Sequence, residues 1–173
     1  MAFRKKQTPG TDDAWRTLVL QIDLVKHAET KAAATLASSG VLGGLLFTLV
    51  SQNRSGGALF VTVASAAAIA VVTAAVAAGI ALRPRLYHRH GSNNLLFYRT
   101  IARRYGHDAA AFGKDLTELY ADRPALLAAL AGQILSNANV ATQKYRAISV
   151  AVAALLAALG LVAAAAIIAL TAA

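Results

Sequence analysis

The residues best suited to chemistry are charged side chains in a helical stretch that leads directly into an apolar one. Asp23, His27 and Lys31 recur every four residues, which places them on one face of an α-helix. Lys26 and Glu29 form an i, i+3 pair on a neighbouring face. Because solvent is scarce beside a membrane, an unpaired carboxylate would be costly there, and we expect Glu29 to have a partner.

These charges have two interpretations that the sequence leaves open. They can form an intramolecular ion-pair network where the helix meets the membrane. Alternatively, they line a ligand pocket or the mouth of a pore and act as gating or junction residues. Lys144 joins Asp23, Glu29 and Lys31 in this candidate set, because Lys144-Tyr145-Arg146 holds the last charges before the final apolar run.

The residue types for catalysis are missing or scattered. The chain shows no nucleotide-binding glycine motif, no nucleophile elbow and no metalloprotease pair. It has no cysteine, and its four histidines lack the spacing of metal ligands. We therefore expect no enzyme activity, no metal and no cofactor. The ligand-binding residues stay unknown at this stage.

Three long stretches without Asp, Glu, Lys or Arg flank the candidate residues and determine where they lie relative to a membrane. Residues 32–53, 55–82 and 147–173 contain 22, 28 and 27 residues, and about 20 helical residues cross a hydrocarbon core. Their Ala, Val, Leu and Gly content is helical rather than alternating. The sequence predicts an all-α integral membrane protein with three transmembrane helices and a helical cytoplasmic stalk.

The chain divides accordingly into seven expected segments. Two stalk helices should continue into spans without a breaker, the second after a helix start at Asp122-Arg123-Pro124. In order, we expect a flexible tail (1–10), a cytoplasmic helix (11–31) continuous with span 1 (32–53), span 2 (55–82), a cytoplasmic helical segment (83–124), and a cytoplasmic helix (125–146) continuous with span 3 (147–173).

The positive charge is distributed as a topology signal. Six Lys or Arg precede span 1, Arg54 stands alone in the first hairpin, and ten lie between Arg83 and Arg146. By the positive-inside rule, we expect the N-terminus to be cytoplasmic and the C-terminus to face outside. The expected partner of the charge is therefore the lipid bilayer. We expect no nucleic-acid binding, because no reader motif accompanies the charge.

Two patterns predict helix packing. Trp15, Leu18, Ile22 and Val25 begin a 3–4 seam that continues through Glu29, Ala32 and Leu36. The seam can pack on the chain's own cytoplasmic segment or between subunits of a homo-oligomer. Gly40 and Gly44 form a GxxxG spacing, which lets helices approach closely in lipid. It can serve the chain's own second span or dimerisation.

Three local patterns in matching order resemble the Pycsar effector membrane family of bacterial antiphage proteins. The first is Ile22-Asp23 followed by Ala28-Glu29-Thr30-Lys31-Ala32 at the entry to span 1. The second is Asn94-Leu95-Leu96-Phe97-Tyr98 with Ile101-Ala102. The third is Leu130 to Ile134, including Gln133, followed by Lys144-Tyr145-Arg146. The resemblance covers roughly Trp15 to Leu161.

The resemblance implies a membrane effector that acts when a cyclic nucleotide, made by a partner cyclase during infection, is sensed. Membrane integrity is then impaired. We expect no separate cyclic-nucleotide-binding domain in these 173 residues. The signal would arrive through a cytoplasmic sensor protein or through a pocket assembled between stalks.

The leading hypothesis is thus a non-enzymatic antiphage effector that acts as an oligomer and impairs the bacterial inner (plasma) membrane. The alternative is a non-conducting membrane scaffold that binds a cytoplasmic partner. A selective transporter is disfavoured, because the spans contain no ionisable side chain.

Overall fold

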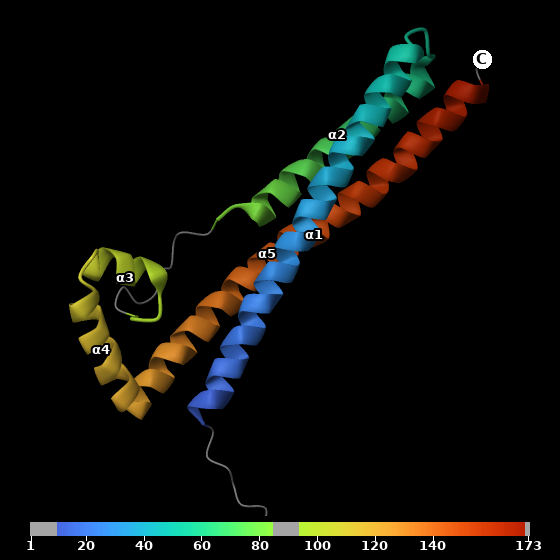
Figure 1. The fold of residues 1–173 in the computed structure, drawn as a ribbon. Helices are drawn as coiled ribbons and strands as arrows, with labels where there is room; N and C mark the ends of the chain where they lie inside the picture. Colours follow the sequence, from blue (N-terminus) through green and yellow to red (C-terminus); the bar gives the residue numbers. More distant parts are fainter. Residues whose placement is uncertain (1–9, 85–93, 172–173) are drawn as a thin grey trace, which may run out of the picture. The chain divides into compact units, whose positions relative to one another are not determined.

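The computed structural model describes residues 10–84 and 94–171, and all regular structure in these ranges is α-helical (Figure 1). The predicted all-α class is confirmed. The predicted tail lies, apart from Gly10, outside the described residues. The helices are α1 (Thr11–Gln52), α2 (Ala58–Leu82), α3 (Tyr98–Tyr105), α4 (Ala109–Ala121) and α5 (Arg123–Thr171).

Three of these helices are long and apolar enough to cross a membrane, namely α1, α2 and α5. At 1.5 Å per residue, the 25 residues of α2 extend about 37 Å, slightly more than a hydrocarbon core of about 30 Å. The 42 residues of α1 and the 49 of α5 are far longer than a span requires. Each of these two helices therefore carries a span and a further charged portion.

The chain forms two compact units, and α1 and α5 contribute to both. The membrane bundle comprises residues 26–84 and 142–173, and the charged unit comprises residues 1–25 and 85–141. The unit boundaries fall after Val25 in α1 and after Ala141 in α5. Neither boundary interrupts its helix, since residues 11–52 and 123–171 are helical throughout.

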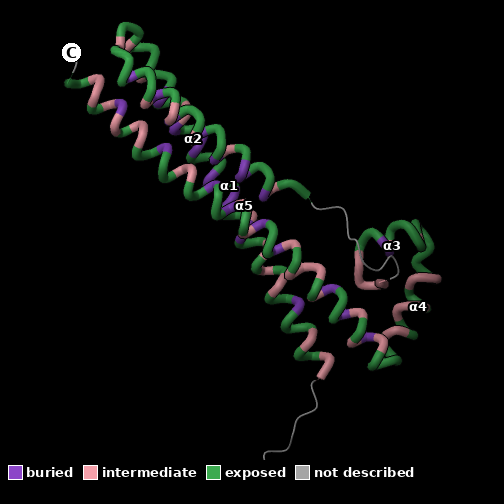
Figure 2. Tube along the Cα trace, turned by 180° about the vertical axis from the view of Figure 1, so that it is seen from behind, coloured by how far each residue is buried: buried purple, intermediate pink, exposed green. Residues whose placement is uncertain are grey.

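Small residues repeat along the packed faces of the membrane bundle. In α5, Ala151, Ala158 and Ala165 lie seven residues apart, and each has no exposed surface. The buried face of α2 follows alternating steps of three and four residues (Phe60, Ala64, Ala67, Val71, Ala74, Ala78, Ala81). A 3.5-residue period keeps one face toward its neighbours along a helix pair, as in a coiled coil. Figure 2 shows these buried positions along α2 and the adjoining part of α5.

The buried clusters define how the three bundle helices run. Leu42 of α1 packs with Val71 of α2 and Ala158 of α5, and one layer further Leu46 packs with Ala64 and Ala67. The residue numbers rise together in α1 and α5 and fall in α2. Within the bundle, α1 and α5 are therefore parallel, and α2 is antiparallel to both.

The buried face of α1 differs from the predicted seam. In the bundle its buried residues are Ala28, Ala32, Thr35, Ser39, Leu42 and Leu46. Ala32 belongs to both sets, but Glu29 is half-buried and Leu36 is exposed. The physical reason is that helices in lipid pack best through small residues, while a large apolar side chain such as Leu36 is equally stable facing lipid.

The charged unit has a core of large apolar side chains, as a soluble helical protein has. Leu18 of α1 packs with Leu126 and Leu130 of α5, and Leu96 and Leu119 cover this cluster. The Asn94 side chain fastens the segment before α3 by donating from Nδ2 to the Ala129 carbonyl at 2.8 Å. Leucine side chains, rather than alanines, therefore form the core here.

Aspartates fix three helix starts in this unit. The Asp122 carboxylate accepts from Ala125 N–H at 3.1 Å, so the cap predicted for α5 is present. Asp108 accepts from Ala111 N–H and starts α4 at Ala109, within the helical segment predicted over 83–124. Asp13 accepts from Gly10 N–H at the start of α1. In the motif Asn94 to Tyr98, Asn94 forms a turn with Leu96 and Phe97, and α3 begins at Tyr98.

Two neighbouring glycines should respond oppositely to alanine. Gly106 ends α3 with a φ of +55°, where a Cβ is strained, so Gly106→Ala should destabilise the charged unit by about 1 kcal/mol. Gly113 lies inside α4, and a Cβ there would meet nothing within 4 Å. Gly113→Ala should therefore stabilise by about 1 kcal/mol. Thermal unfolding in detergent, followed by circular dichroism, measures both; equal effects of the two substitutions would contradict this reading.

Candidate functional site

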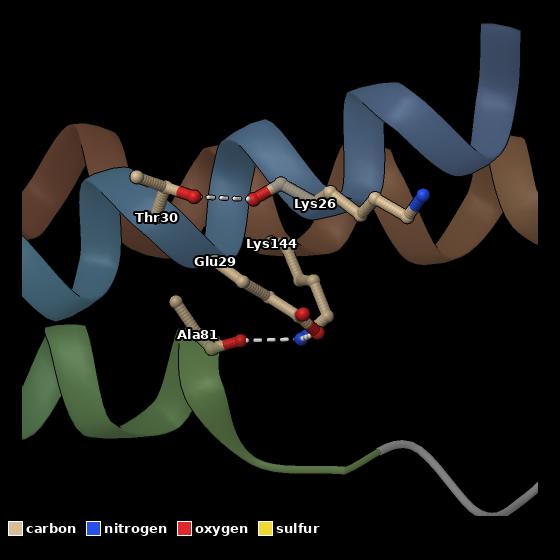
Figure 3. A network of polar contacts seen from close by, with 5 residues as sticks. All are labelled: Lys26, Glu29, Thr30, Ala81 and Lys144. Atoms are coloured by element: carbon tan, nitrogen blue, oxygen red, sulfur yellow. Dashed lines mark hydrogen bonds and ion pairs between the residues drawn. The ribbon is translucent and has the colours of Figure 1, made fainter.

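The Lys144 side chain joins all three helices of the membrane bundle. From α5, its Nζ donates to the Ala81 carbonyl of α2 at 2.6 Å and pairs with Glu29 Oε1 of α1 at 2.9 Å. Figure 3 shows the ammonium between these two oxygens. We call these three groups the lysine clamp.

The Ala81 carbonyl is available because α2 ends one residue later, at Leu82. The last four carbonyls of a helix lack partners within that helix, and the C-terminus carries partial negative charge. An ammonium is therefore doubly suited to this position, as a hydrogen-bond donor and as a cation. Lys144 thus caps α2 from a neighbouring helix.

Lys144 reaches this position because it belongs to the packed face of α5. It precedes Ala151 by seven residues, so it occupies the same repeat position as Ala151, Ala158 and Ala165. Ala28, Ala32 and Ile148 form a buried cluster with Ala81, and Lys144 itself is buried. Among the described residues, Lys144 is the single charged residue in the buried class.

The two charges of the clamp differ in exposure. The Lys144 side chain is 3% exposed and the Glu29 side chain is 46% exposed. Glu29 thus remains accessible from outside the protein while its carboxylate neutralises the buried Lys144 ammonium. Pairing of this kind offsets desolvation more than it adds net stability, whereas removing one partner leaves the other charge uncompensated.

The predicted junction residues have different surroundings. Glu29 pairs with Lys144, whereas the sequence placed Glu29 at i, i+3 from Lys26. In Figure 3 the Lys26 side chain extends away from Glu29. The Lys31 Nζ lies 5.9 Å from the centre of the Tyr145 ring, a cation–π contact between α1 and α5. Asp23 is half-buried in the charged unit.

The predicted packing residues also separate into groups. Leu18 is buried within the charged unit, Val25 is half-buried, and Trp15 and Ile22 are 36% and 38% exposed. A Cβ at Gly40 or Gly44 would meet nothing within 4 Å, so neither glycine lies against α2. The close approach to α2 is at Gly43 instead, where a Cβ would lie 3.6 Å from Val71 Cγ1.

Sequence reasoning missed two features of the site. The Ala81 carbonyl is a backbone group and has no side-chain signature, although the end of a span could have suggested free carbonyls. The second feature is a polar cluster in the charged unit, where Asp115 accepts from Arg104 at 2.8 Å and from the Tyr105 hydroxyl at 2.6 Å. Its signal was the chemistry of α3, where two arginines and a tyrosine are consecutive at residues 103–105.

The Asp115 cluster fastens α3 to α4. Tyr105 also packs edge-to-face on Phe112, with ring centres 5.3 Å apart. Desolvation, followed by the hydrogen bond to Asp115, raises the pKa of Tyr105 above its usual value. The phenol therefore stays protonated and donates at neutral pH. Nothing in this cluster resembles a nucleophile with a base, and no set of three metal-ligating side chains gathers among the residues that the structure describes.

The fold and the clamp define a class: a three-helix membrane protein whose first and last spans continue into a charged helical unit. A family profile described as the Pycsar effector protein domain matches residues 13–172. The chain is also 30% identical over 138 residues to the Pycsar effector protein PtPycTM of Propioniciclava tarda, an alignment that covers 79% of this chain and 68% of that protein. The chain belongs to the Pycsar effector family, as its sequence motifs suggested.

Family membership makes the protein a membrane-embedded effector of antiphage defence. The family domain is not a known enzymatic fold. No solved structure matches the chain.

Glu29→Ala should destabilise the protein more than loss of an exposed glutamate. The substitution leaves the buried Lys144 ammonium with one partner, and an unsatisfied buried group costs about 1–3 kcal/mol. Glu118→Ala, on the exposed surface of α4, is the matched control and should change stability by about 0.5 kcal/mol or less. Thermal unfolding in detergent measures both. Identical melting temperatures for the two variants would show that the pair stabilises nothing.

Proposed function

We propose that this protein impairs the integrity of the bacterial inner membrane when a cyclic-nucleotide signal activates it, and that it acts as a homo-oligomer. Membership of the Pycsar effector family supports the defence role. The membrane-impairing step and its activation are the parts that we add. Its immediate partner is the lipid bilayer, and no catalytic step is needed.

The observation that carries this proposal is the continuity of α1 and α5. Each helix runs without a break from the charged unit into the membrane bundle. Because an α-helix resists axial compression and bending, a displacement of its charged portion is passed to its span. A signal received outside the bilayer can therefore alter the bundle without a separate relay.

The charge distribution supports an orientation with the charged unit in the cytoplasm. The N-terminal portion and the segment between α2 and the span of α5 hold sixteen of the seventeen Lys and Arg residues, and Arg54 lies in the turn between α1 and α2. With the N-terminus cytoplasmic, the C-terminal end of α5 lies outside. The cyclic nucleotide then reaches the charged unit, or a sensor protein bound to it, from the cytoplasm.

Joint expression with a cyclase tests the membrane step. Cells that produce this chain together with an active Pycsar-type nucleotidyl cyclase should lose membrane potential after infection, before they lyse. A potential-sensitive dye reports the change. Cells with the chain and an inactive cyclase, or with the cyclase alone, are the controls and should keep their potential. An unchanged potential in the complete system would refute the membrane-impairing function.

Exposed apolar residues of α1 support the homo-oligomer. In the charged unit, Trp15, Val19 and Ile22 follow i, i+4, i+7 spacing, and all three are exposed, although this portion carries the charges expected in water. Copies inserted in one membrane share an orientation, so their α1 helices are parallel and can meet through the same residues. In the bundle, a Cβ at Gly40 or Gly44 would likewise meet no atom of the described residues within 4 Å.

Because the chain lacks cysteine, single substitutions report this contact cleanly. When membranes that contain the variant are treated with a thiol oxidant, Val19→Cys should form a disulfide-linked dimer, since position 19 lies on the exposed apolar face. Thr17→Cys is exposed on the same helix but about 160° away, at 100° per residue, and should stay monomeric. Equal dimer formation by both variants would argue against a specific contact.

The same apolar face also keeps the scaffold alternative in consideration, because a cytoplasmic partner could cover it. A stable partner that protects Val19→Cys from oxidation, with potential maintained in the complete defence system, would favour the scaffold. A disulfide-linked dimer together with depolarisation would favour the effector.

A further inference from the structure

Alanine-rich seams fix poorly how far one helix is shifted along another. In α2, four positions of the packed face are fully buried alanines, namely Ala67, Ala74, Ala78 and Ala81. The packed face of α5 alternates the fully buried Ala151, Ala158 and Ala165 with larger side chains, of which Ile148 packs with Ala81 and Leu155 packs beside Val71. Because α2 presents short alanine side chains at most of these positions, a shift of α5 by one turn moves its larger side chains from one alanine to the next. Packing of this kind permits close approach, but it discriminates weakly between registers.

Lys144 breaks this uniformity. It holds the repeat position that alanine holds at 151, 158 and 165, and its long side chain needs two specific acceptors. One acceptor, the Ala81 carbonyl, exists because α2 ends there. A shift of α5 by one turn, about 5.4 Å, would move Nζ out of hydrogen-bond range of that carbonyl.

The energetic role of such a residue is known in general terms. A polar side chain at one seam position specifies register at the expense of stability, and a buried ion pair rarely stabilises more than well-packed apolar residues would. An alanine or leucine at 144 would suffice to hold the helices together. A buried lysine at this position is explained if the bundle must favour one axial position of α5 and must also be able to leave it.

We propose that the lysine clamp is a register lock: it holds α5 in one axial position against α1 and α2, and its release is the step that opens the bundle. The lock itself follows from the contacts of Lys144, whereas its consequence for the membrane rests on the proposed function. The half-exposed Glu29 is the accessible member of the clamp, because 46% of its side chain is open to the surroundings while Lys144 is enclosed.

Paired cysteines in the natural cysteine-free background read the register directly. Ala78 and Ala151 pack together, so Ala78→Cys with Ala151→Cys should cross-link when Lys144 is present. Leu155 lies one turn further along α5, so Ala78→Cys with Leu155→Cys should remain at background. In the Lys144→Met background, the second pair should cross-link to an extent comparable with the first.

Lys114→Met is the matched control, because it removes the same charge from an exposed position on α4. It should leave the cross-linking pattern unchanged. If Lys144→Met fails to accumulate in membranes, Glu29→Gln is the substitute variant. It keeps the hydrogen bond from Lys144 to the Ala81 carbonyl and removes only the negative charge that pairs with Lys144. A single register in Lys144→Met, or in Glu29→Gln when that variant is the one tested, would overturn the lock.

Charge reversal tests the role of the Ala81 carbonyl. In Glu29→Lys with Lys144→Glu, the ion pair could re-form, but a carboxylate at 144 would face a carbonyl that also accepts hydrogen bonds. The double variant should therefore behave like Lys144→Met rather than like the unmodified protein. Restoration of a single register by the double variant would overturn the part of the proposal that gives Ala81 a role.

Dye-loaded proteoliposomes, without cyclic nucleotide, test whether release opens the bundle. Lys144→Met should leak and Lys114→Met should stay tight. A tight Lys144→Met vesicle with a shifted register would overturn the opening step while leaving the lock in place. Failure of the unmodified protein to depolarise infected cells would instead contradict the proposed function and would leave the cross-linking result unaffected.

Discussion

The Lys144 ammonium, through its contacts with the Ala81 carbonyl and Glu29, links α5 to α1 and α2. The chain joins α1 to α2 by a short connection, but it joins α2 to the span of α5 only through a long one. A short turn joins α1 to α2, so these two spans are held as a hairpin by the backbone. The span of α5 follows the whole charged unit and has no such connection to its neighbours in the bundle. Its position depends on side-chain contacts, and Lys144 is the contact that distinguishes one axial position from the next.

The clamp also solves a problem of the bilayer. Carbonyls at the end of a helix need donors, and water becomes scarce as the hydrocarbon is approached. A lysine from a neighbouring helix supplies the donor and the positive charge at once, and Glu29 neutralises that charge. The surrounding Ala28, Ala32 and Ile148 let the three helices come close enough for these bonds to form.

The helices α1 and α5 each have one portion suited to water and one portion suited to lipid. In the charged unit, α1 and α5 pack through Leu18, Leu126 and Leu130, and aspartate caps fix the helix starts as in a soluble domain. In the bundle their buried faces are mostly Ala, Ser and Thr, with Leu42, Leu46 and Ile148 among them, because lipid already surrounds large apolar side chains and close approach provides the attraction. A Pycsar effector of this form thus combines a charged unit with a leucine core and a bundle of closely packed helices, joined by unbroken α1 and α5.

The amino-acid sequence by itself determined the helical class, the three spans, the Asp122 cap and the family, and it singled out Glu29 and Lys144 as candidate junction residues. These depend on local properties: uncharged length, periodicity, capping chemistry and short motifs. Tertiary structure alone decided that Glu29 pairs with Lys144, 115 residues away, and that both meet the Ala81 backbone. It also decided which face of α1 points inward. Sequence periodicity could not settle that choice, because lipid and the bundle interior both accept apolar side chains, so Leu36 and Ala28 look alike until the neighbouring helices are in place.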